Sequence, residues 1–288
     1  MSLSKTEIID ALKTQRAKLS ESSAKTYASL LTSLGKRLDI KTVAEFGRDH
    51  AKIIDAIGQM DKPQTQKTLL SALYVLTGDD QYKTVMLEKC KVVNDIYKTQ
   101  KVSDSRKDAW VPFEQIQDKY KSLLAEYKRN PSDMNIMNLL IVGLTSGVLI
   151  PPRRSEWVYV KIKDYNKDTD NYLEKKQFVF NKYKTAKVYG RQTVELPAEL
   201  KAVMTKWLKI NKTDYLFYKP STGKPLTPSD LTRWLGSIFD GTNISVDMLR
   251  SIFLSHQYKG LPAIKALEAQ AEAMGHSVST EINNYVKK

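Results

Sequence analysis

Apolar residues recur every three or four positions through most of the first hundred residues, a spacing that predicts amphipathic helices. The clearest case runs from Ser20 to Leu38, where a Ser-Glu-Ser-Ser start suits a helix N-terminus. The same spacing predicts further helices over Ile8–Leu19, Ala51–Ile57, Thr65–Leu76 and Asp80–Tyr97. Strand-like alternation is missing from these first hundred residues, so the N-terminal half is expected to be all-helical.

The pattern changes in the C-terminal half, where alternating stretches stand between helical ones. Periodicity predicts helices over Pro112–Arg129, Ser132–Leu144, Pro197–Ile210, Thr227–Phe239, Val246–Tyr258 and Leu261–Ala273. β-Branched and aromatic residues alternate in Trp157–Lys163, Gln177–Asn181 and Val188–Leu196. The expected fold class is mainly α, with a small antiparallel β-sheet in the C-terminal domain.

A polar, charged stretch from Lys98 to Asp108 lacks apolar periodicity and predicts an interdomain linker. The expected organisation is a helical domain over residues 1–100, a linker over 101–109 and a second domain over 110–288. A chain of 288 residues is long enough for two such domains.

The charge of the chain favours a polyanionic partner. Lys and Arg number 46 against 32 acidic residues, which gives a net charge of +14 and a pI near 9.5. Of these, 19 basic and 14 acidic residues precede Trp110, and 27 and 18 follow from it. Because the excess is spread over both halves, we expect two positive surfaces, as in a protein that closes around its ligand.

The sequence contains a single cysteine, Cys90, which excludes a disulfide framework or a cysteine-rich zinc site within the chain. The N-terminus lacks the apolar core of a signal peptide, and the longest apolar run, near Ile141–Ile150, is too short to span a bilayer. We therefore expect a cytoplasmic or nuclear protein that is not secreted and has no membrane partner.

Basic residues on the polar faces of the N-terminal helices are candidates for phosphate contact. A solvated helical surface is the better account of any single one of them, but together they predict salt-dependent affinity without base reading. The candidates are Lys25, Lys36, Arg37, Lys62 and Lys67.

Candidate chemistry in the C-terminal half begins at Pro151-Pro152, which forces an extended or turning backbone just ahead of Arg153 and Arg154. Arg250 stands among apolar neighbours, and a guanidinium cannot lose its proton to escape burial. It must therefore be paired in the interior or aimed into a cleft. Lys184 and Lys187 lie in an expected hairpin tip, where a solvated turn is the plain alternative.

The pair Gly275-His276 stands nine residues before Tyr285, close to the last residue of the sequence. A tyrosine hydroxyl has a free pKa of about 10 and is a poor nucleophile, so any chemistry there would need cationic help.

In order along the chain, Arg153-x-Ser155-Glu156, Lys184–Lys187, Leu249-Arg250, Gly275-His276 and Tyr285 resemble the tyrosine recombinase (integrase) family. The segment from Ser23 to Tyr27 resembles the start of that family's core-binding domain. The resemblance implies a two-domain, C-shaped clamp on double-stranded DNA, made of a helical core-binding domain and a catalytic domain. It further implies a homo-oligomer, a tetramer on recombining sites, and no metal or other cofactor.

The resemblance also assigns roles. Tyr285 would attack the scissile phosphodiester to give a 3′-phosphotyrosine, while Arg153 and Arg250 hold the nonbridging oxygens. Lys184 would protonate the leaving 5′-oxygen, with Lys187 as the alternative. His276 would donate a hydrogen bond to the phosphate or assist proton transfer from the tyrosine, and Glu156 would orient Arg153.

Three departures from the family pattern bear on these roles. Asp247 occupies the position, three residues before Arg250, where the family usually has histidine, and a carboxylate there repels a phosphate. Arg154 competes with Arg153 for the clamp, although Arg153 stands three residues before Glu156. Many relatives continue beyond the tyrosine to dock on a neighbouring subunit, so either assembly uses another surface or the chain is trimmed.

The sequence therefore predicts a site-specific DNA recombinase, an integrase of a virus or other mobile element. One alternative uses the same transesterification to relax DNA strands, as type IB topoisomerases do. Another is a DNA-binding protein with impaired catalysis, which Asp247 favours.

Overall fold

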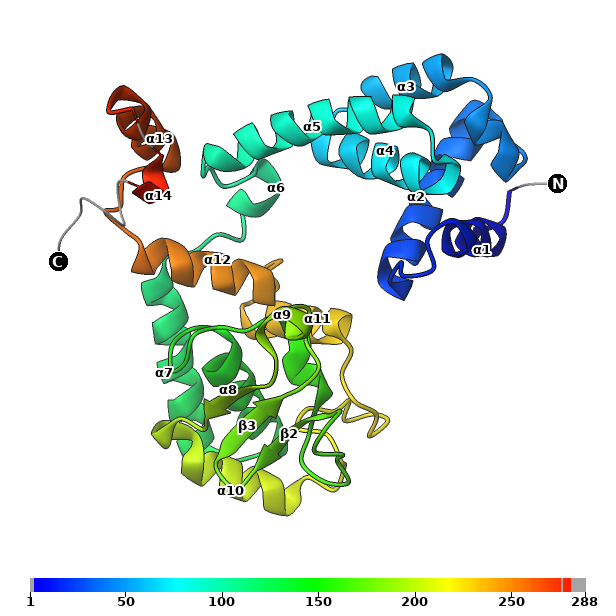
Figure 1. Cartoon of the computed structure of the whole chain (residues 1–288). Helices are drawn as coiled ribbons and strands as arrows, with labels where there is room; N and C mark the ends of the chain where they lie inside the picture. Colours follow the sequence, from blue (N-terminus) through cyan, green and yellow to red (C-terminus); the bar gives the residue numbers. More distant parts are fainter. Residues whose placement is uncertain (1–2, 276, 281–288) are drawn as a thin grey trace. The chain divides into compact units, whose positions relative to one another are not determined.

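A computed structural model of the chain is shown in Figure 1, and its described residues are 3–275 and 277–280. This part of the chain is mainly helical and carries one small sheet. The chain divides into two units. The first contains the residues up to Lys101 together with the segment that begins at Pro262, and the second is Val102–Leu261.

The first unit is helical, as its apolar periodicity predicts. Its elements are α1 (Lys5–Gln15), α2 (Glu21–Leu38), the 3-10 helix η1 (Val43–Gly47), α3 (His50–Gly58), α4 (Pro63–Thr77) and α5 (Asp80–Lys98). Side chains at the N-caps fix where helices begin: Ser20 accepts from the backbone of Ser23, and Asp79 accepts from Gln81.

The core of the first unit forms where the apolar stripes of these helices meet. Leu31 of α2 and Leu70 of α4 are fully buried in it. The buried hydroxyl of Tyr82 on α5 donates a 2.6 Å hydrogen bond to the carbonyl oxygen of Phe46. That bond ties α5 to η1 through the interior of the unit.

The segment after Pro262 adds α13 (Ile264–Ala273) and α14 (Val278–Thr280) to the first unit. Lys98 Nζ lies 2.9 Å from Glu268 Oε1, and the backbone N–H of Ile264 donates to the side chain of Gln100. Helix α13 is therefore held by residues at the C-terminal end of α5.

The second unit begins with α6 (Asp104–Lys107), a short helix inside the stretch predicted as a linker. Next come α7 (Phe113–Arg129), α8 (Asp133–Thr145), η2 (Ser155–Tyr159), β1 (Val160–Lys161), β2 (Asn171–Glu174) and β3 (Gln177–Phe180). The remaining elements are α9 (Ala186–Tyr189), β4 (Gln192–Glu195), η3 (Ala198–Leu200), α10 (Lys201–Ile210), α11 (Pro228–Ile238) and α12 (Val246–Gln257).

The sheet differs from the antiparallel one that the sequence predicts. Within the described residues it has four strands in the order β1-β2-β3-β4, and β1 pairs with β2 in parallel while the other pairs are antiparallel. Trp157 lies on η2 rather than on a strand, and Val188 lies on α9. The prediction of a purely antiparallel sheet is therefore wrong, and the sheet is mixed.

A buried amide explains why the pattern of apolar residues does not predict β2. Oδ1 of Asn171 accepts from the backbone N–H of Asn181 and Lys182, at 3.0 and 2.7 Å, while its Nδ2 donates to the carbonyl oxygen of Lys182. These bonds join the start of β2 to the chain that follows β3. Because this buried position holds a polar residue, the strand lacks the apolar pattern from which a buried strand is predicted.

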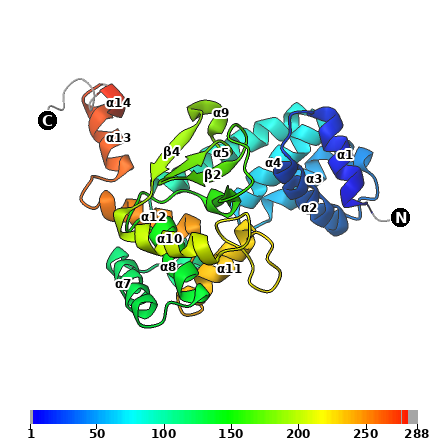
Figure 2. The same cartoon turned by 90° about the horizontal axis from the view of Figure 1, so that it is seen from below.

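Helices α8 and α10 lie on one side of the sheet, as Figure 2 shows. Helix α8 is buried along nearly its whole length, as its apolar sequence predicts. Trp157 is fully buried, and its ring meets Phe178 and Phe180 edge-on, with centroids 5.0 and 5.1 Å away. The core of this unit thus supports the turn that carries Arg153. Among the described residues, no helix has the length and apolar character needed for a membrane crossing.

Candidate functional site

Two arginines that are far apart in the sequence line one cavity of the second unit. Arg153 comes from the turn between α8 and η2, and Arg250 comes from α12. The cavity has a volume of about 380 Å³ and is also lined by Tyr183, Tyr189 and Gln192. The Nε of Arg250 donates a 3.2 Å hydrogen bond to the carbonyl oxygen of Pro152, so the two arginines are joined through the backbone.

The guanidinium of Arg153 is fixed on several sides, and only 15% of its side chain is exposed. Nη1 donates to Oε1 of Gln192 at 2.9 Å, and Nη2 lies 3.3 Å from Oε1 of Glu156. The guanidinium carbon lies 4.1 Å from the centre of the Phe180 ring and 5.1 Å from that of Tyr183. Such contacts preorganise a cation and leave few rotamers open to it.

The local sequence explains how Arg153 reaches this place. Helix α8 ends at Thr145, and Gly147 follows with φ of +92°, a conformation that glycine adopts without strain. Pro151 and Pro152 then keep the backbone out of the helical region until η2 begins at Ser155.

Arg250 sits one turn into α12, whose N-cap Ser245 accepts a hydrogen bond from the backbone of Met248. Leu249 and Ile252 face the core, while 26% of the Arg250 side chain stays exposed. Of the two alternatives for this arginine, an interior pair or a cleft, the structure places it at the cavity.

Asp247 lies beside Arg250, and one of its oxygens, Oδ1, is 3.8 Å from Nη1 of that arginine. Its other oxygen, Oδ2, accepts a 2.6 Å hydrogen bond from Nη2 of Arg106 on α6. The carboxylate three residues before Arg250 is thus paired with two cations.

Arg154 is exposed and lines two cavities. One is the cavity of Arg153 and Arg250. The other, of about 320 Å³, is lined by Arg154, Arg250 and Asp247 with hydroxyls of Ser155, Thr232 and Ser245. Arg154 and Arg250 therefore line both cavities, whereas Arg153 lines only the first.

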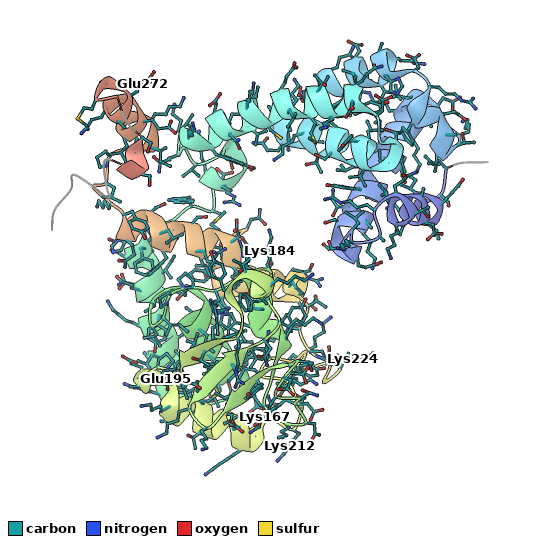
Figure 3. The ribbon with its side chains drawn as sticks, in the orientation of Figure 1. Lys167, Lys184, Glu195, Lys212, Lys224 and Glu272 are labelled. Atoms are coloured by element: carbon teal, nitrogen blue, oxygen red, sulfur yellow. The ribbon has the colours of Figure 1, made fainter. Side chains whose placement is uncertain are left out.

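The predicted lysines lie on the connection between the antiparallel strands β3 and β4, where the sequence predicts a hairpin tip, and this connection contains the short helix α9. Lys184 and Lys187 are both exposed, and neither is among the residues that line the Arg153–Arg250 cavity. Figure 3 shows Lys184 at the α9 end of the unit. Tyr183 and Tyr189 from the same connection do line the cavity.

His276 and Tyr285 lie outside the described residues, so the structure bears on neither their positions nor their contacts.

Two of the basic candidates of the first unit share a cavity of about 440 Å³. Arg37 and Lys62 line it together with Asp61 and the hydroxyl residues Ser33 and Thr65. Of the other candidates, Lys25 pairs with Glu21 at 3.6 Å, Lys36 is exposed and Lys67 is half-buried.

Sequence reasoning missed Gln192 and Arg106, which hold Arg153 and Asp247 respectively. The only sequence feature of Gln192 is its place in an expected strand, which does not mark it as part of a site. Arg106 lies in a stretch whose composition predicts only a linker. The described residues contain no group of three or more His, Cys, Asp or Glu side chains that could hold a metal ion. Comparison with protein-family models, curated proteins and solved structures gives no significant match.

Proposed function

We propose that this chain is a site-specific DNA recombinase that cleaves and rejoins double-stranded DNA through a 3′-phosphotyrosine on Tyr285. The observation that carries the proposal is the meeting of Arg153 and Arg250 at one cavity, with Arg250 bonded to the carbonyl oxygen of Pro152. Two fixed guanidiniums suit an anion with more than one hydrogen-bond acceptor oxygen, and a tetrahedral phosphodiester presents two nonbridging oxygens of that kind.

In the proposed reaction, the Tyr285 oxygen forms a bond to phosphorus while the bond from phosphorus to the 5′-oxygen breaks. Arg153 and Arg250 neutralise the negative charge that grows on the nonbridging oxygens. Lys184 gives a proton to the departing 5′-oxygen, with Lys187 as the alternative, and His276 accepts the proton that the tyrosine hydroxyl loses. The bond energy is kept in the phosphotyrosine, so rejoining needs no nucleotide cofactor.

Glu156 supports this assignment because it lies 3.3 Å from Nη2 of Arg153 and can orient the guanidinium. Both units would contact the duplex as the two arms of a clamp. The distribution of positive charge over both halves of the sequence supports that arrangement, as does the cavity of Arg37 and Lys62. The active form would be a homotetramer on paired sites, serving a virus or other mobile element.

A second candidate is a DNA-binding protein that has lost efficient catalysis. It is favoured by Asp247, whose carboxylate lines the same cavity as Arg154 and Arg250. A negative charge at that place opposes binding of a phosphate unless another cation neutralises it.

A covalent-capture experiment tests the proposal. Nicked suicide duplexes, taken from inverted repeats beside the encoding gene and from a randomised library, are incubated with the protein, and denaturant-resistant adducts are counted. We expect adducts with the wild-type chain and with Tyr97→Phe, a matched change at an exposed tyrosine, and none with Tyr285→Phe. An equal yield from Tyr285→Phe would exclude the proposed nucleophile, and tight binding without adducts would favour the second candidate.

A further inference from the structure

Asp247 bridges two arginines from distant parts of the second unit. Its Oδ2 accepts from Nη2 of Arg106 at 2.6 Å, across 141 residues of sequence, and its Oδ1 lies 3.8 Å from Nη1 of Arg250. The side chains of Arg106 and Asp247 are 41% and 63% exposed. The carboxylate therefore stands at the edge of the site with a guanidinium on each side.

The position of Asp247 creates an electrostatic problem for the proposed function. The cavity that it lines carries two other ionisable groups, Arg154 and Arg250. An unpaired carboxylate there would repel a phosphate and would compete with it for Arg250. Pairing with Arg106 offsets part of that repulsion and engages Oδ2 in a hydrogen bond, so that this oxygen is less available to Arg250.

We propose that Arg106 is a positioning residue of the phosphate site, which acts through Asp247 and leaves Arg250 available to a DNA phosphate. The proposal rests on the proposed function for the identity of the anion. Arg106 would neutralise the carboxylate of Asp247, from a segment that the sequence marks only as a linker.

The pair is poorly explained as a contribution to folding. Helix α6 has no buried residue, and exposed ion pairs stabilise proteins little. A neighbouring pair provides the comparison: Lys107 lies 2.6 Å from Asp104 within α6, and both side chains are exposed. Neither Lys107 nor Asp104 contacts a residue of the site through that pair, so Lys107→Gln is a matched control for Arg106→Gln.

The test uses the full-length chain and four variants: Arg106→Gln, Lys107→Gln, Asp247→Asn, and Arg106→Gln combined with Asp247→Asn. The rate of adduct formation is measured in a single turnover at saturating protein on a suicide duplex, and DNA affinity is measured over a range of salt. Thermal unfolding of each variant checks that it is folded.

We expect Arg106→Gln to slow adduct formation by about tenfold, less than the 10²–10³ that follows loss of a direct donor. Lys107→Gln should change the rate by less than about twofold. The double variant should recover most of the rate, because the asparagine removes the charge that Arg106 neutralises. The recovery separates this role from a merely structural one.

Two results would overturn the proposal: equal rates for Arg106→Gln and Lys107→Gln, or a double variant no faster than Arg106→Gln alone. A wild-type chain that forms no adduct would instead contradict the proposed function. In that case DNA affinity decides the role of Arg106. Weaker binding of Arg106→Gln that Asp247→Asn restores would support the pairing, and unchanged binding would exclude it.

Discussion

The Nε of Arg250 donates a hydrogen bond of 3.2 Å to the carbonyl oxygen of Pro152, the residue immediately before Arg153. This bond joins α12 to the turn that presents the other arginine. One N–H of the Arg250 guanidinium is thus used to hold the side chain, and Nη1 lies 3.8 Å from Oδ1 of Asp247, beyond hydrogen-bonding distance, so the terminal N–H groups can bond to a ligand. The bond to Pro152 constrains how far the Arg250 guanidinium lies from the turn that carries Arg153.

Replacement of Arg250 by lysine tests that arrangement. Lysine keeps the charge but lacks the Nε–H and the planar fork, so it cannot bond to Pro152 and to two phosphate oxygens together. We expect Arg250→Lys to lower the rate of adduct formation by about 10²–10³ with little change in DNA affinity. Arg129→Lys, at an exposed position in the last turn of α7, is the matched control.

Single-turnover rates at saturating protein, with affinity measured separately, distinguish the two effects. A variant that keeps the wild-type rate would show that the fork of Arg250 is not used in the transition state. A loss of affinity equal to the loss of rate would assign Arg250 to general DNA binding.

The turn before Arg153 depends on Gly147. Its φ is +92°, and a Cβ added there would lie 2.5 Å from Cδ2 of Phe253 on α12. Gly147→Ala therefore combines backbone strain with a clash against the helix that carries Arg250. We expect a loss of about 2–4 kcal/mol in unfolding free energy, of which overpacking contributes about 1–3 kcal/mol.

Gly223→Ala is the control for this prediction, because Gly223 also has a positive φ of +66° but its added Cβ would meet nothing within 4 Å. That variant should lose only the strain contribution, about 1–2 kcal/mol. Denaturant unfolding measures both. If the two variants are equally destabilised, the contact between Gly147 and Phe253 is not tight in solution.

The longer helices could be predicted from the sequence because each carries an apolar stripe, and several also have a residue that caps the N-terminus. Ser20 and Asp79, for example, mark the N-termini of α2 and α5 within a residue. The strands carry less evidence, since each is at most four residues long. The buried amide of Asn171 and the short helix α9 depend on partners that a local pattern does not contain.

The site divides in the same way. The spacing of Arg153 and Glu156 is local, and the structure brings those two side chains together. Arg106 and Asp247 are 141 residues apart in the sequence, and Gln192 and Arg153 are 39 apart. Neither contact can therefore be predicted from composition or local spacing. Only the fold of the second unit makes them neighbours.

The N-terminus of α11 gives a prediction about pH. Thr227 caps the helix, its side chain accepting from the backbone of Asp230, and Asp230 Oδ2 accepts in return from the backbone of Thr227. Lys219 Nζ lies 2.7 Å from the same carboxylate. The hydrogen bonds from Lys219 and Thr227 hold the pKa of Asp230 well below its usual range.

Because the pKa of Asp230 is lower in the folded chain, the unfolded chain takes up the proton first as the pH falls. The stability that this carboxylate contributes is therefore fully present above its ordinary pKa of about 3.9 and is lost progressively below it.

We expect Asp230→Asn to be less stable than the wild type at pH 7, and the difference to shrink as the pH falls from about 5 toward 2. Thr227→Ala, which removes the cap, should cost about 1 kcal/mol at pH 7. Unfolding free energies from denaturant titrations at several pH values measure these differences, and a gap between wild type and Asp230→Asn that stays constant down to pH 2 would contradict the bonding of this carboxylate.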